Sequence, residues 1–273
     1  MRLRLWHKRP YDVLRKPLDR VVAEVGIAYP NPRPNAECSV VAVLWNEEPR
    51  IGRLLTYLQP HFRHIVLCVQ QGTDRTLDIA RAMAREGDVV LEDEHRGLAE
   101  ASAPLVASAV RTPWSLVLAA DEWPSRALLD AMATIVGYAE RHRYDGVWVP
   151  FRPTVGGIPL EEQGGNFRIC RSDLEWPVTM HSRPEVRRSL WWPHGHIDHE
   201  RSLDELVLDY LRYFEMGRGS AHWESHNALM IRRACVAVAA RRGWPHVKAR
   251  AWWPRAQAVA FDDQWSVEAG GWG

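Results

Sequence analysis

The fold of this chain is decided by the stretch Trp114-Ser115-Leu116-Val117-Leu118-Ala119-Ala120-Asp121-Glu122-Trp123. Its first seven residues are an apolar run of the kind that forms a buried strand, and the run ends abruptly at two carboxylates. A buried strand that delivers acids at its carboxyl end is a common way to place charge in the crevice of an α/β sheet. We therefore expect Asp121 in such a crevice, where a carboxylate can hold a divalent cation and the cation can hold a diphosphate.

The segments upstream repeat the same alternation of strand and helix. Apolar runs at 39–45, 64–69 and 89–91 predict three further buried strands. Apolar residues at helical spacing predict helices that begin near Pro49 and after the turn at 70–74, and a third helix follows over about 98–110. This order of elements implies a mostly parallel central sheet with helices on both faces.

Three of these segments resemble family-2 glycosyltransferases. Ser39 to Glu48 resembles the first strand of the family and its Tyr-Asn-Glu-Glu ending, and Leu118 to Glu122 resembles its Leu-Asp-Ala-Asp-Glu. Gln70 to Thr76 resembles its Asp-Asp-Gly-Ser-Thr-Asp-Arg-Thr segment, and order and spacing agree over roughly residues 38 to 130. The resemblance implies an α/β, GT-A-like fold, a nucleotide-diphosphate sugar donor and a divalent cation, Mn²⁺ or Mg²⁺.

The resemblance also assigns residues to the donor site. Asp121 matches the last acid of the family motif, which usually meets the metal, while Ala119 replaces the first acid. Gln70 stands where the family has an acid that contacts the base, and an amide offers both a donor and an acceptor to a base edge. Trp45 replaces the family Tyr, so it either stacks on a base or packs in the core. The full set of expected nucleotide-sugar contacts is Trp45, Asn46, Glu47, Gln70, Asp74 and Asp121.

The downstream half resembles lipopolysaccharide-core-type members of the same family. Residues 166–172 resemble an Arg-Leu-Phe-Arg-Arg strand, and His181 stands at the His of Val-His-Glu, with Ser182 in place of the Glu. The base that takes the proton of the acceptor would then be Glu185, the nearest acid downstream, or His181 itself.

The histidine cluster 194–199 is the other candidate for metal chemistry in this half. Ile197-Asp198-His199 resembles the late Ile-x-His of the family, which implies that His199 completes the metal shell beside Asp121. The alternatives for this cluster are a polar loop before a helix or a zinc site, since imidazole suits zinc.

The chain is expected to have three parts. A basic arm and Pro-rich linker occupy 1–37, a glycosyltransferase domain occupies 38–218, and a Trp-rich extension occupies 219–273. Within the domain, 38–125 would be the nucleotide-sugar half and 126–218 the acceptor half. The basic arm either contacts anionic lipid or a phosphorylated acceptor, or it is a solvated arm, so membrane contact would be peripheral at most.

Composition excludes some classes of protein. With 273 residues and a net charge of +1, the chain has no overall nucleic-acid-binding charge. No apolar run approaches the roughly 20 residues of a membrane span. The four cysteines form no Cys-x-x-Cys pair, so we expect reduced core cysteines and a cytoplasmic protein.

These features predict a hexosyltransferase-type glycosyltransferase that is metal-dependent and, by resemblance, inverting. The acceptor would be a glycan, a lipid-linked molecule or a protein. Two alternatives stay open. A nucleotidyltransferase would normally carry a Gly-rich basic phosphate loop where this chain has Asn46-Glu47-Glu48-Pro49. A non-catalytic nucleotide- or sugar-binding relative is favoured by the acids lost at Ala119 and Gln70.

Overall fold

The computed structural model describes residues 35–160, 164–178, 184–218 and 221–261. Most of the basic arm and His181 lie outside these residues. Internal contacts divide the chain into two compact units, Met1–Phe151 with Gly164–Ile197 and Arg152–Gln163 with Asp198–Gly273. The domain boundaries expected from the sequence stay a prediction, and each unit is described by itself below.

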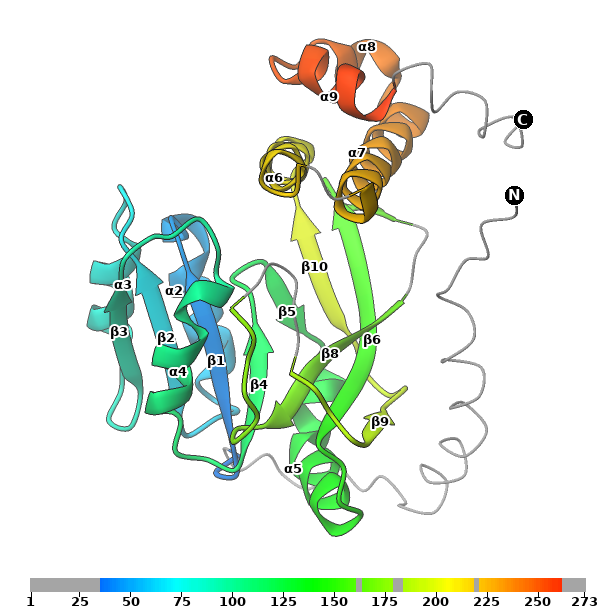
Figure 1. Cartoon of the computed structure of the whole chain (residues 1–273). Coiled ribbons are helices and arrows are strands. Elements are labelled where there is room, and N and C mark those ends of the chain that lie inside the picture. The colour runs from blue at the N-terminus through cyan, green and yellow to red at the C-terminus, as the bar shows by residue number, and fades with distance from the viewer. Residues whose placement is uncertain (1–34, 161–163, 179–183, 219–220, 262–273) are drawn as a thin grey trace. The chain divides into compact units, whose positions relative to one another are not determined.

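Four parallel strands form one side of the sheet in the first unit (Figure 1). They are β1 (Cys38–Leu44), β2 (Ile65–Gln70), β3 (Val89–Asp93) and β4 (Trp114–Leu118), in the spatial order β3-β2-β1-β4. β1 and β2 consist almost entirely of apolar residues and are buried along nearly their whole length. Continuous apolar strands of this kind require cover on both faces of a parallel sheet.

Helices provide that cover. Alternate side chains of β1, such as Val40 and Ala42, pack in one core with α2 (Glu48–Leu58), α3 (Thr76–Met83) and α5 (Arg126–Arg141). Val41 points to the other face and packs with α4 (Ala103–Ala109). The predicted helices on both faces are therefore confirmed. The helix expected over 98–110 is shorter, because a 3₁₀ turn (Glu100–Ser102) precedes α4, and Pro104 in its first turn suits the beginning of a helix.

The sheet becomes antiparallel beyond β4. β8 (Gly164–Arg171) runs antiparallel to β4, and β6 (Gly146–Val155) runs antiparallel to β8. A short strand, β9 (Ser189–Trp191), pairs with the beginning of β6, and β5 (Glu122–Pro124) follows β4 after a turn. The sheet is therefore mixed, and the expected parallel arrangement holds for its first four strands.

The second unit is mainly helical. The last residues of β6 form a hairpin with β7 (Ile158–Pro159), and β10 (Ile197–Arg201) leads into the helices. These are α6 (Leu203–Met216), α7 (Ala221–Arg242), α8 (Trp244–Lys248) and α9 (Trp253–Ala260). The predicted capping box of Ser202 and Glu205 begins α6, and Gly217 ends it. The Trp252 indole N–H donates to Asp204 at 2.7 Å and links the Trp-rich end of the chain to α6. Among the described residues, no helix combines the length and the apolar character needed to cross a bilayer.

Candidate functional site

Parallel pairing brings polar residues of the first unit to one end of the sheet. β1 and β2 end at the same level, so that Trp45 and Gln70 are the next pair in register. β4 pairs with β1 so that Asp121 follows Leu118 by as many residues as Trp45 follows Ala42. The carboxyl ends of parallel strands are where α/β proteins bind ligands. Trp45, Gln70 and Asp121 therefore come from the same edge of the sheet.

Hydrogen bonds fix the loop after β1 against the loop after β2. Asn46 has φ of 55°, a left-handed conformation that Asn tolerates, and its Oδ1 accepts the Thr73 N–H at 2.8 Å. The Glu47 N–H donates to the Thr76 hydroxyl at 2.7 Å. A Cβ at Gly72 would lie 2.1 Å from Asn46 Oδ1, so a larger residue there would displace the Asn46 side chain and its hydrogen bond to Thr73. The two loops predicted to hold the donor thus form one connected structure.

Asp74 is the centre of this connection. Its carboxylate accepts the Glu48 N–H at 2.9 Å, the Thr76 N–H at 3.0 Å and the Thr76 hydroxyl at 2.6 Å. Burial alone would raise the pKa of Asp74, but these hydrogen bonds lower it below its ordinary value. The charged carboxylate thereby satisfies N–H groups at the beginnings of α2 and α3. The Glu47 carboxylate is paired with Arg50 at 3.0 Å. Asp74 shapes the loops, and its contact with a nucleotide sugar stays a prediction.

Gln70, His95 and Trp45 form a second connected group. Gln70 is buried, and its Nε2 donates to the Leu98 carbonyl at 2.8 Å and to the Ser102 hydroxyl at 2.9 Å. Its Oε1 forms a 2.9 Å hydrogen bond with His95 Nδ1. The His95 ring stacks on Trp45 with centroids 4.1 Å apart and an interplanar angle of 5°. The Gln70 amide therefore orients His95, and the 39% exposed Trp45 carries the accessible aromatic surface of the group.

The polar group after β3 was not singled out from the sequence. Asp93 accepts the Ser102 hydroxyl at 2.8 Å and pairs with Arg96 at 2.5 Å. Burial alone would raise the pKa of Asp93, but hydrogen bonds from Ser102 and the Glu94 N–H, together with the Arg96 charge, lower it. The sequence does contain a pattern that indicates this group, because a polar run follows the third apolar strand just as polar runs follow the first two. His95 and Asp93 belong to the same edge as the predicted residues.

A closed turn presents Asp121 after β4. The Glu122 carboxylate accepts the Ala119 N–H at 2.9 Å, and the Glu122 N–H donates to the Ala119 carbonyl at 3.2 Å. Arg168 of β8 forms an ion pair with the same carboxylate. Asp121 is 5% exposed and Glu122 is 2% exposed. Because a buried carboxylate needs a charged or hydrogen-bonded partner, the Arg168–Glu122 pair stabilises the turn that contains Asp121.

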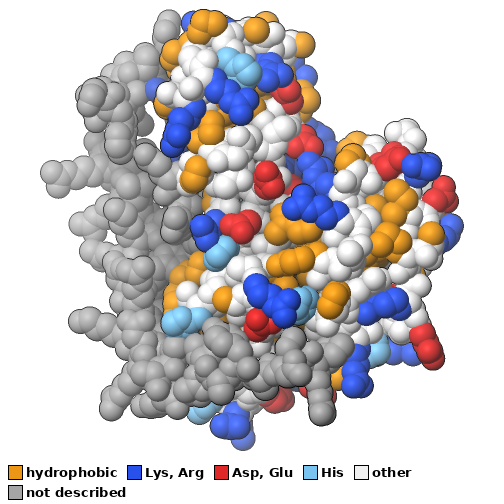
Figure 2. Space-filling view, turned by 180° about the vertical axis from the view of Figure 1, so that it is seen from behind, with side chains coloured by type: hydrophobic (Ala, Val, Ile, Leu, Met, Phe, Trp, Pro, Cys, Tyr) orange, Lys and Arg blue, Asp and Glu red, His pale blue; other side chains and the backbone are white. Residues whose placement is uncertain are grey.

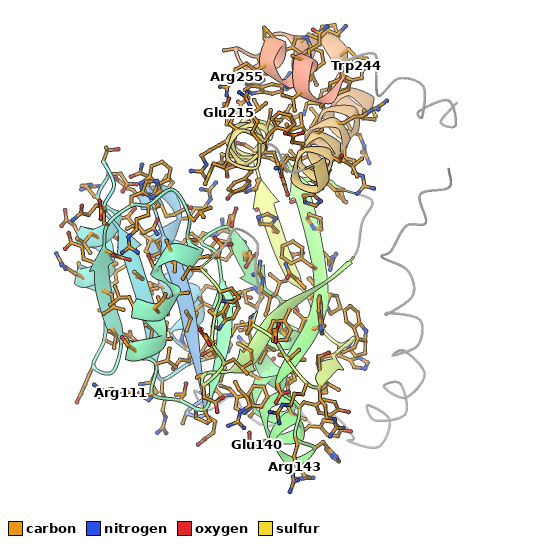
Figure 3. The ribbon with its side chains drawn as sticks, in the orientation of Figure 1. Arg111, Glu140, Arg143, Glu215, Trp244 and Arg255 are labelled. Atoms are coloured by element: carbon orange, nitrogen blue, oxygen red, sulfur yellow. The ribbon has the colours of Figure 1, made fainter. Side chains whose placement is uncertain are left out.

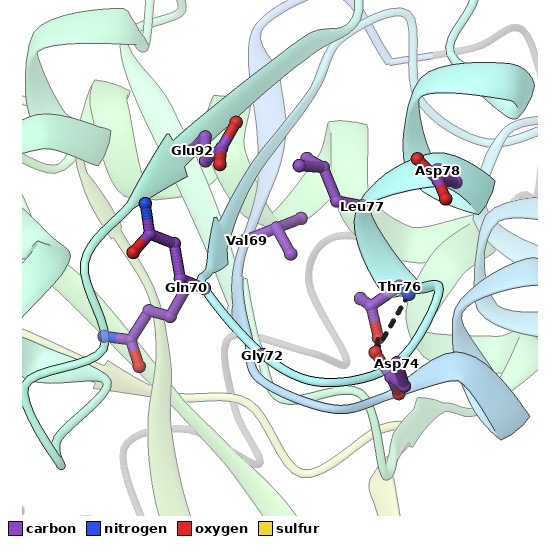
Figure 4. A pocket seen from close by; sticks show the side chains of 9 residues that line it. Val69, Gln70, Gly72, Asp74, Thr76, Leu77, Asp78 and Glu92 are labelled. Atoms are coloured by element: carbon purple, nitrogen blue, oxygen red, sulfur yellow. Dashed lines mark hydrogen bonds between the residues drawn. The ribbon is translucent and has the colours of Figure 1, made fainter.

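A small pocket opens beside the loop after β2 (Figure 4). Its volume is about 180 Å³, and its lining includes Gly72, Thr76 and the carboxylates of Asp74, Asp78 and Glu92. Ligand pockets commonly measure about 300–1,000 Å³, so this one holds at most part of a nucleotide sugar.

Glu185, the first candidate base, lies elsewhere in the first unit. It lines a cavity of about 440 Å³ together with Asp145 and Arg171. In the antiparallel register of β8 and β4, Arg171 lies opposite Trp114 at the beginning of β4, whereas Asp121 follows the end of β4. A five-residue strand spans about 16 Å, so Glu185 is at the opposite end of the sheet from Asp121. The role of Glu185 as the catalytic base stays a prediction. The position of Glu185, far from Asp121, does not support that role.

His199 and His181 complete the predicted site residues. His199 lies on β10 in the second unit, where its carbonyl accepts the Thr154 hydroxyl at 3.5 Å, and its metal contact stays a prediction. His181 lies outside the described residues. Within the part of the chain that the structure describes, no three His, Cys, Asp or Glu side chains are grouped to hold a metal ion. Mg²⁺ is usually held by one or two carboxylates with waters and substrate phosphates, so Asp121 fits a cation that enters with a diphosphate.

Comparisons with known proteins give distant structural neighbours. No family model and no curated protein matches the sequence. The mannosyltransferase PcManGT from Pyrobaculum calidifontis, in complex with GDP-Man and Mn²⁺, is 14% identical over 94% of this chain and 96% of that chain, with a TM-score of 0.45. TarS from S. aureus is 14% identical with a TM-score of 0.44, and the match covers 72% of this chain and 43% of that one.

TarS 1–349 in complex with UDP-GlcNAc is 15% identical over 82% of this chain and 81% of that chain, also with a TM-score of 0.44. Two of these neighbours were thus solved with nucleotide-diphosphate sugars. TM-scores below 0.5 carry no argument about what this chain does. Its function has to be argued from its own residues.

Proposed function

We propose that this chain is a glycosyltransferase that moves a sugar from a nucleotide-diphosphate donor to a hydroxyl group of an acceptor. One observation carries the proposal. Trp45, the loop 70–76 and Asp121 come from the same edge of one parallel sheet. They follow one another in the order in which the family-2 enzymes carry their donor-binding segments.

The nucleotide would bind across the ends of β1 and β2. The exposed indole of Trp45, backed by His95, offers a flat aromatic surface on which a base can stack. The loops fixed by Asn46 and Asp74 would border the ribose and the diphosphate. Because Gln70 uses its amide to orient His95, its influence on the base would be indirect.

The chemical step requires that the leaving diphosphate be stabilised and that the acceptor hydroxyl lose its proton. A divalent cation, Mn²⁺ or Mg²⁺, supplies charge stabilisation of the diphosphate when it is bound. Asp121 would provide a carboxylate oxygen to hold it. The expected outcome is inversion at the anomeric carbon. His181 stays the candidate base, and 126–218 stays the candidate acceptor half.

Donor titration tests the proposal. Calorimetry with UDP-GlcNAc, GDP-Man and dTDP-Glc, each with and without Mn²⁺, should find one donor that binds more tightly when Mn²⁺ is present. Asp121→Asn should remove about tenfold or more of that Mn²⁺-dependent affinity, because a neutral amide is a poor ligand for a hard cation. Asp173→Asn is the matched control, since Asp173 is an exposed carboxylate at the other end of β8. Failure of all three donors to bind, or wild-type affinity of Asp121→Asn, would contradict the proposal.

Two further assays separate the alternatives. Release of pyrophosphate from a nucleoside triphosphate and a sugar phosphate would indicate a nucleotidyltransferase. Donor binding without donor hydrolysis, and without transfer to any acceptor, would indicate a non-catalytic binding protein. The glycosyltransferase proposal predicts slow, Mn²⁺-dependent donor hydrolysis and no pyrophosphate release.

A further inference from the structure

The face of the molecule in Figure 2 points to no particular ligand. Its described side chains are a mixture of basic, acidic and hydrophobic groups. A surface that attracts a charged ligand gathers charges of one sign. The interior of the first unit, by contrast, contains a connected network of polar side chains at the edge of the sheet.

This hydrogen-bond network runs from the loop after β3 to the aromatic pair beside β1. The Asp93 carboxylate accepts the Ser102 hydroxyl at 2.8 Å, and the Ser102 oxygen accepts the Gln70 Nε2–H at 2.9 Å. Gln70 Oε1 then bonds to His95 Nδ1 at 2.9 Å, and the His95 ring stacks on Trp45. Ser102 is 0% exposed and Gln70 is 2% exposed, so water does not compete for the central bonds of the network.

The direction of each hydrogen bond follows from the chemistry of the groups. An ionised carboxylate only accepts, so the Ser102 hydroxyl donates to Asp93 and its oxygen accepts from the Gln70 amide. Gln70 Nε2 also donates to the Leu98 carbonyl at 2.8 Å, which fixes the amide nitrogen on that side. Gln70 Oε1 can only accept, so His95 Nδ1 must carry the proton that it donates. Neutral His95 is therefore held as the Nδ1–H tautomer.

Asp93 anchors the network because its carboxylate stays ionised. Burial alone would raise the pKa of Asp93, but the Ser102 hydroxyl, the Glu94 N–H and the Arg96 charge lower it below its ordinary value. Arg96 pairs with the second carboxylate oxygen of Asp93 and also donates to the Ala101 carbonyl at 3.0 Å. The loop from Asp93 to Ser102 is thus closed on itself, and it contains His95.

We propose that Asp93, Ser102 and Gln70 are positioning residues for the nucleotide base, which act on Trp45 through His95. The inference rests on the proposed function. His95 lies parallel to the indole with centroids 4.1 Å apart, and Trp45 is 39% exposed, so a base can reach it. A ring that is already held in place loses less conformational freedom when a ligand binds. The network therefore adds affinity for a ligand that stacks on Trp45, although Gln70 itself does not touch the base.

Calorimetric titration of the full chain with UDP, GDP and dTDP, each with Mn²⁺, measures this contribution. Inorganic pyrophosphate with Mn²⁺ is the matched ligand, because it has the diphosphate but no base. His95→Leu should weaken binding of the nucleotide that the wild-type protein binds most tightly by about two- to tenfold, the cost of ordering one more side chain. It should leave the affinity for pyrophosphate unchanged.

His142→Leu is the matched control variant. His142 also stacks on an aromatic ring, that of Tyr138, with centroids 4.2 Å apart. It lies at the C-terminal end of α5, between Glu140 and Arg143 (Figure 3). Because this end of α5 is away from the carboxyl ends of β1 and β2, His142→Leu should change neither the nucleotide nor the pyrophosphate affinity.

A double-mutant cycle separates positioning from direct contact. Gln70→Met keeps most of the side-chain volume but removes both polar atoms of the amide, so it should also weaken nucleotide binding about two- to tenfold. In the His95→Leu background it should have no further effect on nucleotide affinity, because Gln70 acts only through His95. Additive losses of affinity would assign Gln70 to direct contact with the base and would overturn the inference.

The tautomer of His95 gives a readout that needs no ligand. Long-range ¹H–¹⁵N spectra of the ¹⁵N-histidine-labelled protein, with the His95 signals identified by their loss in His95→Leu, should show Nδ1–H in the wild type. Gln70→Met should remove this preference. A wild-type His95 in the Nε2–H form would overturn the inference.

The binding data distinguish failure of the inference from failure of the proposed function. If the wild-type protein binds a nucleotide and His95→Leu binds it equally well, the inference is overturned and the proposed function stands. Equal weakening of nucleotide and pyrophosphate binding by His95→Leu would also overturn the inference, because it would indicate a general disturbance of the site. If the wild-type protein binds none of the three nucleotides, the proposed function falls and this inference falls with it.

Discussion

Replacing Arg168 by Met tests whether a buried ion pair holds the turn that presents Asp121. The substitution keeps most of the side-chain volume but removes the cation from Glu122, whose side chain is only 2% exposed. Removing one partner of a buried ion pair costs about 3–5 kcal/mol, because it leaves an uncompensated charge. The Arg168 side chain is 22% exposed, so we expect the lower end of this range, about 3 kcal/mol. That would be a large fraction of the roughly 5–15 kcal/mol by which proteins are stable.

Urea unfolding, followed by circular dichroism and by tryptophan fluorescence, measures this loss. Arg171→Met is the matched control, since Arg171 is on the same strand but pairs with the more exposed acids Asp173 and Glu140. It should cost less than about 1 kcal/mol. The double variant Glu122→Gln/Arg168→Met should recover at least about 1 kcal/mol relative to Arg168→Met, because it no longer buries an unpaired charge. The reasoning is refuted if Arg168→Met loses no more stability than Arg171→Met.

Two further predictions concern packing and ionisation. Gly72→Ala places a Cβ 2.1 Å from Asn46 Oδ1 and should lower stability by about 1–3 kcal/mol. Gly137→Ala in α5, with open space around it, should raise stability by about 0.5–1 kcal/mol. A raised melting temperature for Gly72→Ala, or a lowered one for Gly137→Ala, would contradict this reasoning. Burial raises the pKa of Cys170 and of Cys235 to about 12. Because thiols of the unfolded chain ionise above about pH 8.5 while these two stay protonated in the fold, the free energy of unfolding should fall as the pH rises above that value. A free energy of unfolding that stays constant up to pH about 10 would contradict this prediction.

The sequence predicted the elements of the first unit well, for a physical reason. The runs at 39–45, 64–69 and 114–120 are short and apolar, and the helices between them have apolar residues at helical spacing, so each pattern is local. The capping box of Ser202 and Glu205 is equally local, and the structure confirms it. Parallel order then followed from the alternation of strands and helices.

What the sequence could not predict depends on contacts between distant segments. The antiparallel pairing of β8 with β4 is one such contact, and it carries the chain around Glu185 to the amino end of β4. The stacking of His95 on Trp45 depends on the Gln70 amide, which joins segments 25 residues apart. The Arg168–Glu122 pair spans 46 residues. None of these leaves a periodic pattern in the chain.

Amide hydrogen exchange with a bound donor tests the central claim most directly. The account predicts that a saturating nucleotide sugar with Mn²⁺ slows exchange at 45–48, 70–76, 93–97 and 119–122, the segments that leave the carboxyl ends of β1 to β4. Peptides covering 171–174 and 185–188, at the opposite end of the sheet, should be unaffected. Protection confined to those opposite segments, or the absence of any donor-dependent protection at the strand ends, would contradict a donor site at the edge of Trp45 and Asp121.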